Sequence, residues 1–337
     1  MKEIFEKLAT KQDLSEGEIE EVFNRILNGE LTESQIAALL LGLKMKGETV
    51  DEIAGVVKSL KKHAVQLPQT YSDAMCNCGT GGDQSYSFNI STTACFILAA
   101  GGIRLAKAGN RSISSKSGSA DVLEELGINI AANPEVLSKA LSEVVTDLSC
   151  EKKKQTMHPA MRFIGPARRA LGVPTIMNIV GPLANPLSLD SQLMGVYRED
   201  LQLDLAHVMK KMGRRRALLI TGPNHMDEAA LFGENHYTLL TDGNIHQGSF
   251  TFADVDLNPL ELADIQGGDA VENAEILLSV LQNQASPYLE TTVLNAGLGF
   301  YANGKVSSIR EGVELARSLL ADGSALRKLE ELREVQI

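Results

Sequence analysis

The chain has 337 residues, and Asp plus Glu (43) outnumber Lys plus Arg (32), which gives a formal net charge of -11. Aromatic residues make up only 4% of the chain, and tryptophan is absent. A length of this order suggests about two domains. The charge argues against a surface for duplex nucleic acid, and the lack of aromatic rings argues against a base-stacking platform. A local basic pocket for a small anion is compatible with both.

Residues 1–70 are predicted to form a small N-terminal helical domain. Apolar residues recur at helical spacing from Ile19 to Leu27, and capping boxes at residues 32–35 and 49–52 open two further helices. The helix over 36–45 is apolar around most of its girth, which is typical of a helix buried on two sides. A dimer contact through this domain would supply the second side. The start of the chain lacks the apolar core of a signal peptide, and no apolar run reaches about 18 residues, so no membrane span is expected.

After Pro68 the pattern changes to short β-type runs that alternate with glycine-rich turns and helices. This alternation predicts an α/β domain over residues 72–337 with a mainly parallel central sheet, and the last part of the chain returns to C-terminal helices. Four cysteines are too few for a disulfide framework, so a reducing cytoplasm is expected. Cys76 and Cys78 have no second ligand pair at zinc spacing, which favours small buried thiols in a strand over a metal site.

A glycine-rich loop, Gly79-Thr80-Gly81-Gly82-Asp83, directly follows the first predicted strand. Bare N–H groups in such a loop can form a nest for an anion, and the backbone can approach a ligand closely. The spacing matches neither a Walker A motif nor a dinucleotide fingerprint. By itself the loop is therefore equally compatible with an ordinary tight turn.

A second polar segment, Asn89-Ile90-Ser91-Thr92-Thr93, opens the helix that follows this loop. Asn, Ser and Thr at a helix start cap free N–H groups, and the same position binds phosphate. Both elements follow one strand, so an anion site is favoured over plain capping.

The loop from Lys107 to Asp121 holds two lysines, one arginine and five serines within fifteen residues. Few loops need so many cations and hydroxyls for folding, so in an acidic chain this segment is interpreted as a bed for a polyanion. Asp227 and Glu228 follow the apolar strand over 217–221, where an open α/β sheet places its ligands. Mg2+ favours one or two carboxylates together with phosphate oxygens and water, although the dipeptide alone would more often be a surface pair.

Taken in order, these segments resemble the anthranilate phosphoribosyltransferases over essentially the whole chain. The motifs that carry the resemblance are Gly79-Thr80-Gly81-Gly82-Asp83, Asn89-Ile90-Ser91-Thr92, Lys107 with Gly109-Asn110-Arg111-Ser112 and Ser114-Ser115-Lys116-Ser117-Gly118, His158-Pro159-Ala160-Met161, Arg168, Asn178 with Gly181-Pro182-Leu183 and Asn185-Pro186, and Asp227-Glu228. Gly268-Asp269-Ala270 and Glu272-Asn273-Ala274 also fit the family's C-terminal pattern.

The resemblance implies a helical domain, with a contribution from about residues 160–185, joined to an α/β domain, usually in a homodimer through the helical domains. It implies transfer of 5-phosphoribose from phosphoribosyl pyrophosphate to the amine of anthranilate, in tryptophan biosynthesis, with two Mg2+ ions per subunit. Small-molecule substrates are the expected partners, without nucleic acid or membrane. An aromatic amine is unprotonated at neutral pH, so the chemistry rests on charge neutralisation and positioning more than on a base.

Carried over residue by residue, the resemblance assigns four groups of site residues. For phosphoribosyl pyrophosphate these are Gly79, Thr80, Gly81, Gly82, Asp83, Ser87, Asn89, Ser91, Thr92, Lys107, Gly109, Asn110, Arg111, Ser112, Ser115 and Ser119. For anthranilate they are Gly79, Asn110, His158 and Arg168. For Mg2+ they are Ser91, Asp227 and Glu228, and the catalytic group is Lys107.

Two departures from the family pattern stand out. Ala108 replaces a histidine that normally follows the lysine, which removes a polar contact near the acceptor. The stretch 146–155 is charged where the family has an apolar strand, which we expect to be central and buried. One coding of residues 146–151, read one base later, gives Gln-Ile-Tyr-Leu-Ala-Lys. We therefore hypothesise two compensating frame shifts around residues 145–155, which resequencing of the coding DNA tests.

Two other functions stay open at this point. A pyrimidine nucleoside phosphorylase shares the fold, but its nucleoside-binding signature is not visible. A non-catalytic relative that binds nucleic acid or protein would show a basic groove and degraded motifs, and the charge of -11 speaks against it.

Overall fold

The computed structural model describes residues 1–66, 68–108, 117–130, 134–144, 146–149 and 158–336. The helices are α1 Lys2–Ala9, α2 Glu16–Leu27, α3 Glu33–Lys46, α4 Val50–Lys62, α5 Ile90–Ala100, α6 Ser119–Glu125, α7 Pro134–Glu143, α9 Gly165–Leu171, α10 Ile176–Val180, α11 Gln202–Lys211, α12 Ala270–Leu281, α13 Pro287–Asn303, α14 Ile309–Ala321 and α15 Ser324–Val335. Short 3-10 turns are η2 Pro159–Phe163, η3 Glu199–Leu201, η4 Pro223–His225, η5 Phe252–Val255 and η6 Leu262–Ile265.

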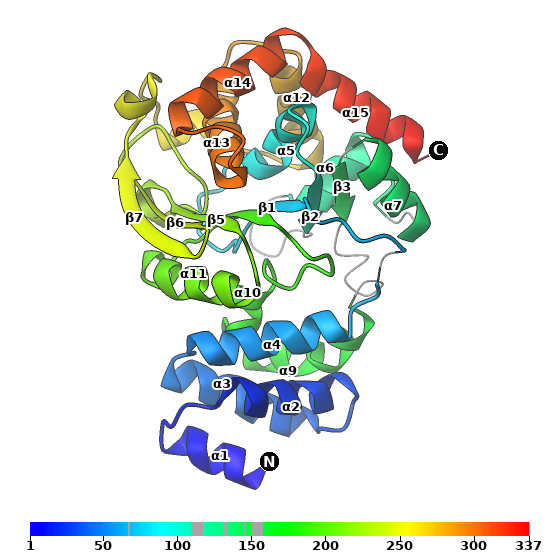
Figure 1. Cartoon of the computed structure of the whole chain (residues 1–337), viewed down its shortest axis with the longest axis vertical. Coiled ribbons are helices and arrows are strands. Elements are labelled where there is room, and N and C mark those ends of the chain that lie inside the picture. Colours follow the sequence, from blue (N-terminus) through cyan, green and yellow to red (C-terminus); the bar gives the residue numbers. More distant parts are fainter. Residues whose placement is uncertain (67, 109–116, 131–133, 145, 150–157, 337) are drawn as a thin grey trace.

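A seven-stranded sheet crosses the middle of the molecule (Figure 1). Its strands are β1 Met75–Gly79, β2 Leu105–Ala108, β3 Thr146–Ser149, β4 Ser191–Gly195, β5 Arg216–Thr221, β6 Asn235–Thr241 and β7 Asn244–Phe250. Their order is β3-β2-β1-β4-β5-β6-β7, and the first five in this order run parallel. The predicted, mainly parallel sheet is confirmed. The carboxyl ends of β1, β4 and β5 therefore meet at one edge, where the polar loops begin.

The N-terminal helices form the bundle below the sheet in Figure 1. Both predicted capping boxes are present: Thr32 pairs with Gln35 at the start of α3, and Thr49 pairs with Glu52 at the start of α4. Helices α9 and α10, from a distant part of the sequence, pack against α3 and α4. Their buried apolar side chains share one core with the bundle, with α11 and with the lower face of β4 and β5. Burial of this continuous core holds the helical part against the sheet.

The C-terminal helices cover the opposite face of the sheet, together with α5 (Figure 1). Helix α13 is buried around nearly its whole girth, because α5 and α14 pack against it on different sides. The largest side chains of this core, Phe96 and Phe300, are fully buried. Truncation of such a phenylalanine to alanine costs about 3–5 kcal/mol, so this layer anchors the N-terminal end of α5 at the carboxyl edge of β1.

Two features of the sheet differ from the prediction. The charged stretch forms strand β3, but β3 is an edge strand and not a central one. An edge strand pairs on one side only, which relaxes the demand for continuous hydrophobicity; residues 150–155 of the stretch lie outside the described residues.

The β6–β7 hairpin was also missed. Its Asp242-Gly243 turn has positive φ at both residues, 47° and 83°, and this dipeptide is a strong hairpin signal.

Helix α3 is buried on one side by the bundle and presents apolar side chains on the other. Leu41 and Met45 are 39% and 71% exposed in the single chain. The contact expected for this second side is a partner chain, and the dimer stays a prediction. In the described ranges, no helix combines the length and the apolar character that crossing a membrane requires.

Candidate active site

Three glycines make room for the Asp227-Glu228 loop at the carboxyl edge of the sheet. A Cβ atom on Gly195, the last residue of β4, would lie 1.5 Å from the Asp227 carbonyl oxygen. A Cβ on Gly79 would lie 2.2 Å from Asp227 Oδ2, and one on Gly222 would lie 2.2 Å from the Glu228 carbonyl oxygen. These approaches exclude any larger residue, so the loop is seated by close backbone packing. Gly79 was predicted as a site residue; Gly195 and Gly222 were missed, although both lie at strand ends.

The glycine-rich loop contacts the same carboxylate. Gly81 and Gly82 have φ values of +67° and +87°, a region that other residues enter only with strain. This conformation lets the Gly81 N–H donate to Asp227 Oδ2 at 2.6 Å. The Thr80 N–H donates to the Gly195 carbonyl at 2.9 Å, and the Asp227 N–H donates to Asp83 Oδ2 at 3.4 Å. The structure therefore brings the two predicted segments into direct contact across 144 residues of sequence.

The two neighbouring carboxylic acids are half-buried, and the charge of Asp227 disfavours the charge of Glu228. Burial, reinforced by the nearby charge of Asp83, raises the pKa of Asp227 to about 7. Burial and the charge of Asp227 raise the pKa of Glu228 to about 8, against the opposing influence of Lys107 and a hydrogen bond with Ser91. Such perturbed acids at the carboxyl edge of an α/β sheet are typical of a functional site.

The donor set fits a hard divalent cation. Asp227, Glu228 and the Ser91 hydroxyl supply oxygen ligands, and a cation would relieve the repulsion that raises both pKa values. Within the described ranges, no three His, Cys, Asp or Glu side chains are gathered as a complete metal cage. Mg2+ does not need such a cage, since it usually keeps several waters and takes substrate oxygens beside one or two carboxylates.

Lys107 lies beneath the start of α5. Its side chain is 3% exposed, and Nζ donates to the Asn77 carbonyl at 2.7 Å and to Ser91 Oγ at 2.9 Å. Burial lowers the pKa of Lys107, but the nearby Cys95, Cys78 and Glu228 raise it by more. The pKa of Lys107 therefore lies above its ordinary value. The ammonium group is therefore a fixed positive charge behind the predicted metal ligands. Asn77, which holds it, was not predicted.

The N-terminus of α5 is not closed by a side-chain cap. Asn89 occupies the N-cap position, but its side chain makes no capping hydrogen bond, which corrects the alternative of plain capping. Instead Asn89 Oδ1 accepts a hydrogen bond from Asn273 Nδ2 at 2.9 Å. Ser87, which precedes it, pairs with Gln266, and Thr92 is buried in the first turn. The positive end of the helix dipole is left without a side-chain cap, an arrangement that favours an anion.

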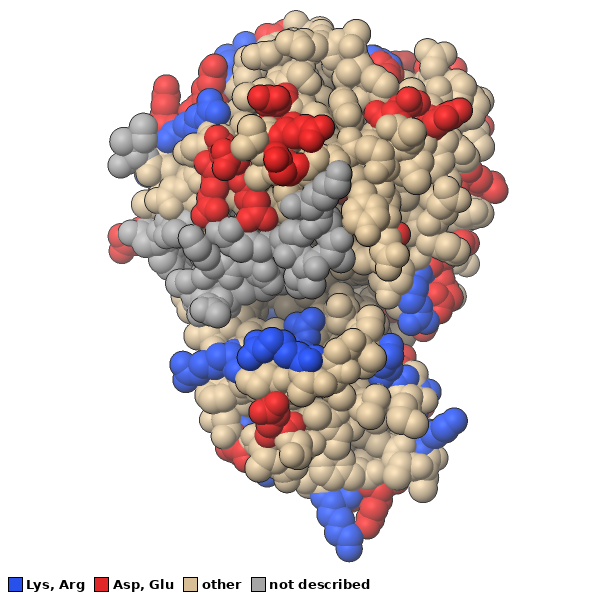
Figure 2. All heavy atoms as spheres, turned by 180° about the vertical axis from the view of Figure 1, so that it is seen from behind, with Lys and Arg blue, Asp and Glu red and all other residues tan. Residues whose placement is uncertain are grey.

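Two of the residues predicted for the acceptor, Arg168 and His158, lie on the helical side of the molecule. Arg168 is half-buried in α9, and its Nη2 donates to Asn178 Oδ1 at 3.5 Å. His158 precedes η2, with Nε2 2.9 Å from the Ala184 carbonyl oxygen. On the face in Figure 2, Asp and Glu gather on the upper part, whereas Lys and Arg gather on the adjoining edge of the lower part.

Part of the predicted site lies outside the residues that the structure describes. Ser119 is described and begins α6. Ala108 ends β2, and its side chain is not described. The predicted ligand residues outside the described ranges are Gly109, Asn110, Arg111, Ser112 and Ser115.

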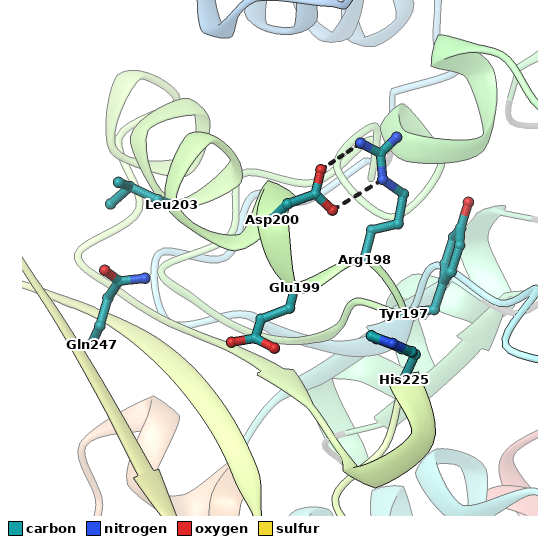
Figure 3. Close-up of a pocket in the computed structure, with 7 residues that line it drawn as sticks. All are labelled: Tyr197, Arg198, Glu199, Asp200, Leu203, His225 and Gln247. Carbon is teal, nitrogen blue, oxygen red and sulfur yellow. Dashed lines mark hydrogen bonds and ion pairs between the residues drawn. The ribbon is translucent and has the colours of Figure 1, made fainter.

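A hollow of about 830 Å3 lies beside the loops after β4 and β5. Figure 3 shows its seven lining residues: Tyr197, Arg198, Glu199, Asp200, Leu203, His225 and Gln247. Arg198 forms a bidentate ion pair with Asp200, and the Tyr197 N–H donates to Thr80 Oγ1. The hollow therefore adjoins the glycine-rich loop. None of its lining residues was predicted from the sequence, because their spacing matches no motif.

The buried thiols expected in the first strand are confirmed. Cys76 and Cys78 are buried thiols, adjacent on one side of β1, with Sγ atoms 3.4 Å apart. Cys95 in α5 is also buried, and burial raises the pKa of its thiol to about 11. Thiols that hold their protons this strongly are structural and unreactive.

The fold and site define a glycosyltransferase class. Residues 2–64 match the helical bundle domain of the glycosyl transferase family, and residues 71–326 match its a/b domain. Among curated proteins, the anthranilate phosphoribosyltransferases of Streptococcus thermophilus and Streptococcus mutans are 68% and 62% identical to this chain, each over 100% of both chains. The chain belongs to the anthranilate phosphoribosyltransferase family, as its motifs indicated.

Solved structures agree with this assignment. The crystal structure of anthranilate phosphoribosyltransferase from Thermus thermophilus superposes with a TM-score of 0.92 at 35% identity, over 99% of each chain. The Saccharomyces cerevisiae enzyme in complex with PRPP and Mg has a TM-score of 0.89 at 22% identity, over 99% of this chain and 96% of that one. At that identity the second match supports the fold alone.

Proposed function

We propose that this chain transfers 5-phosphoribose from phosphoribosyl pyrophosphate to the amine of anthranilate, giving N-(5-phosphoribosyl)anthranilate and pyrophosphate, in tryptophan biosynthesis. The observation that carries the proposal is the Asp227-Glu228 pair, seated by three glycines beside an uncapped helix start, in a chain 68% identical to such an enzyme. Membership of the glycosyl transferase family fits a reaction that breaks and forms bonds at carbon-1 of a ribose.

The phosphoribosyl pyrophosphate site is proposed at the carboxyl edge of β1 and β2. The N–H groups of Thr80 and Gly81 are committed to Gly195 and Asp227, so in the apo form they organise the loop. The open N-terminus of α5, with Asn89, Ser91 and Thr92, supplies donors and a favourable dipole for phosphate oxygens. Lys107 contributes positive potential through its buried ammonium group, which stabilises charge on the leaving pyrophosphate. The same bed includes Ser87, Ser119 and the predicted residues of the 109–115 loop.

Ser91, Asp227 and Glu228 are proposed to hold Mg2+, with two ions per subunit. When bound, Mg2+ neutralises pyrophosphate oxygens and so improves the leaving group. The Ser91 hydroxyl accepts a hydrogen bond from the Lys107 ammonium group and is hydrogen-bonded to the Glu228 carboxyl. These two bonds orient the Ser91 hydroxyl among the proposed Mg2+ ligands. Asp227 is held in place by the Gly81 N–H.

The acceptor is proposed to approach from the helical side, where Arg168 and His158 lie. Gly79 and Asn110 are also assigned to anthranilate. A guanidinium group suits the acceptor's carboxylate, because charge-assisted pairs of this kind are short and directional. The amine needs no strong base, since an aromatic amine is neutral at pH 7. Positioning of this amine against carbon-1 is the main contribution expected from the acceptor residues.

Two further features belong to the proposal. The apolar face of α3, with Leu41 and Met45 exposed, supports a homodimer through the helical domains. A cytoplasmic location would keep the three described cysteines as thiols, which is how they occur here.

Fluorescence of anthranilate tests the function directly. Protein, MgCl2, phosphoribosyl pyrophosphate and anthranilate are mixed, and the loss of anthranilate fluorescence is followed together with pyrophosphate release. We expect both signals to proceed in equal amounts and to stop in excess chelator. Phosphorolysis of a pyrimidine nucleoside without anthranilate turnover would instead support the phosphorylase alternative. Binding of RNA or protein without either reaction would support a non-catalytic relative.

A further inference from the structure

A segment far along the chain is docked against the residues that lead into α5. The Phe88 N–H donates to the Ile265 carbonyl at 3.1 Å, and the Gly267 N–H donates to the Tyr86 carbonyl at 2.9 Å. Gln266 adds a side-chain hydrogen bond to the Ser85 carbonyl at 2.9 Å. We call residues 265–273 the clamp segment, because they hold the chain that carries Ser87 and Asn89.

The contact leaves no room for side chains at its centre. A Cβ atom on Gly267 would lie 2.8 Å from Phe88 Cα and 2.8 Å from Asn273 Oδ1. A Cβ on Gly268 would lie 1.6 Å from Glu272 Oε2. Gly267 therefore lets the clamp segment approach the backbone of residue 88 directly, which fixes the position of Asn89 beside it.

Asn273 connects three pieces of chain from within the clamp segment. It is 3% exposed, and its Nδ2 donates to Asn89 Oδ1 at 2.9 Å and to Ser117 Oγ at 2.7 Å. Its Oδ1 accepts from the Gly268 N–H at 2.9 Å. Asn89 opens the helix start proposed for phosphate, and Ser117 belongs to the predicted polyanion loop, residues 107–121. One buried amide is therefore bonded to both elements.

We propose that Asn273 is a positioning residue for phosphoribosyl pyrophosphate, which acts through Asn89 and Ser117 and does not touch the substrate. By donating to Asn89 Oδ1, it sets the direction of the Asn89 amide, so that Nδ2 of Asn89 faces away from Asn273 and is kept for an anion. This inference rests on the proposed phosphate site at Asn89. It adds a residue outside every group assigned to that site.

Asn273→Asp is the sharpest variant because it keeps the size and shape of the side chain while it removes the N–H donors and adds a negative charge. The carboxylate still accepts from the Gly268 N–H and can still accept a hydrogen bond from the Ser117 hydroxyl. It can no longer donate to Asn89, whose amide must turn to place Nδ2 toward it. Asn89 then presents an oxygen to the phosphate. We expect the KM for phosphoribosyl pyrophosphate to rise about tenfold, and the KM for anthranilate to stay within about twofold.

Asn303→Asp is the matched control. Asn303 Nδ2 also donates to a serine hydroxyl, Ser191 Oγ, at 3.0 Å, but Ser191 begins β4 and so lies at the opposite edge of the sheet. This variant should leave both KM values unchanged. An equal rise of the phosphoribosyl pyrophosphate KM in both variants would overturn the proposal, because it would show a general effect of the new charge or of lost stability.

A double-mutant cycle with Asn89→Ala separates positioning from charge repulsion. Once Asn89 has no amide to turn, Asn273→Asp should change the KM for phosphoribosyl pyrophosphate by less than about twofold. A simple repulsion between the new carboxylate and the substrate would persist in that background and overturn the proposal. If Asn89→Ala alone leaves this KM unchanged, the proposed phosphate site fails instead. Should Asn273→Asp not fold, Asn273→Ala replaces it in the same cycle, with the same expected loss of coupling.

Discussion

Two regions of this molecule shield carboxylates from solvent, fully in one and partly in the other, with opposite consequences. In the helical part, Glu52 is fully buried and satisfied: Oε1 accepts from the Leu14 N–H at 2.9 Å, while Oε2 accepts from the Thr49 N–H at 2.9 Å and pairs with Lys46 at 3.0 Å. At the edge of the sheet, Asp227 and Glu228 lie next to each other, and their mutual repulsion adds to the effect of burial.

The difference lies in the partners and not in the residue type. A buried carboxylate with a cation and two N–H donors is a structural connection, since removal of one partner leaves the others uncompensated. The half-buried neighbours Asp227 and Glu228 have pKa values raised to about 7 and 8, so they hold protons near neutral pH, which a metal ion can replace. The first arrangement stabilises the fold, and the second is a site whose preferred occupant is a cation.

The largest expected effect is on the paired carboxylates. Asp227→Asn combined with Glu228→Gln should reduce kcat/KM by about 10⁴-fold, because metal assistance is worth several kcal/mol. The same double variant should unfold at the same temperature as the wild type or at a higher one, since it removes repulsion between two half-buried acids. Steady-state kinetics and thermal denaturation in chelator check both parts. If the double variant were markedly less stable but still active, Asp227 and Glu228 would be structural residues and not a metal site.

Glu52→Ala should show the opposite pattern. The substitution leaves Lys46 and the Leu14 and Thr49 N–H groups without their shared acceptor, so the free energy of unfolding should fall by about 3–5 kcal/mol. The KM values of the folded enzyme should not change. Urea denaturation measures the loss. Glu30→Ala is the control, because the Glu30–Arg25 pair is exposed and should contribute less than about 1 kcal/mol.

A third variant tests the division of the site between the two regions. Arg168→Ala should raise the KM for anthranilate by about one to two decades, the equivalent of roughly 1.5–3 kcal/mol for a charge-assisted pair. The KM for phosphoribosyl pyrophosphate should move far less. Arg169→Ala, the exposed neighbour on the same helix, serves as the reference. If Arg168→Ala raised the KM values for both substrates equally, Arg168 would not be a specific contact of the acceptor.

The smallest expected effect concerns a half-buried cation where the two regions meet. Lys61 Nζ donates to the Leu187 carbonyl at 3.1 Å, and burial, with Arg214 nearby, lowers the pKa of Lys61 to about 8. The ordinary value is 10.5, so the folded state releases this proton first and stability should rise with pH between about 8 and 10.5.

Lys61→Met should therefore abolish most of that rise and stabilise the protein at pH 7 by about 1–2 kcal/mol, less than the full shift because the side chain is partly exposed. Denaturation curves from pH 7 to 10.5 measure it. Lys62→Met, on the exposed side of α4, should leave the pH dependence in place. A pH profile identical in wild type and Lys61→Met would show that this amine is not the titrating group.

Local signals account for what the sequence predicted well. The capping boxes at Thr32 and Thr49 and the helical periodicity of the C-terminal segments depend on neighbours within one or two turns, so they survive in the structure. The glycine-rich loop and the Asp227-Glu228 pair indicated a site only in combination with the other motifs, since each by itself also fits an ordinary turn or a surface pair. Asp242-Gly243 carried an equally local hairpin signal that was overlooked.

Tertiary structure decided the features that depend on distant partners. Nothing near Gly195 or Gly222 in the sequence indicates that the Asp227 loop passes within van der Waals distance of both. The edge position of β3 follows from strand order, and the sequence of one strand does not encode its neighbours. The same holds for Asn273, whose partners are 184 and 156 residues away. Composition and periodicity thus determined the elements and the chemistry of the site. Packing between segments far apart in the chain determined which carboxylates are satisfied and which are left for a ligand.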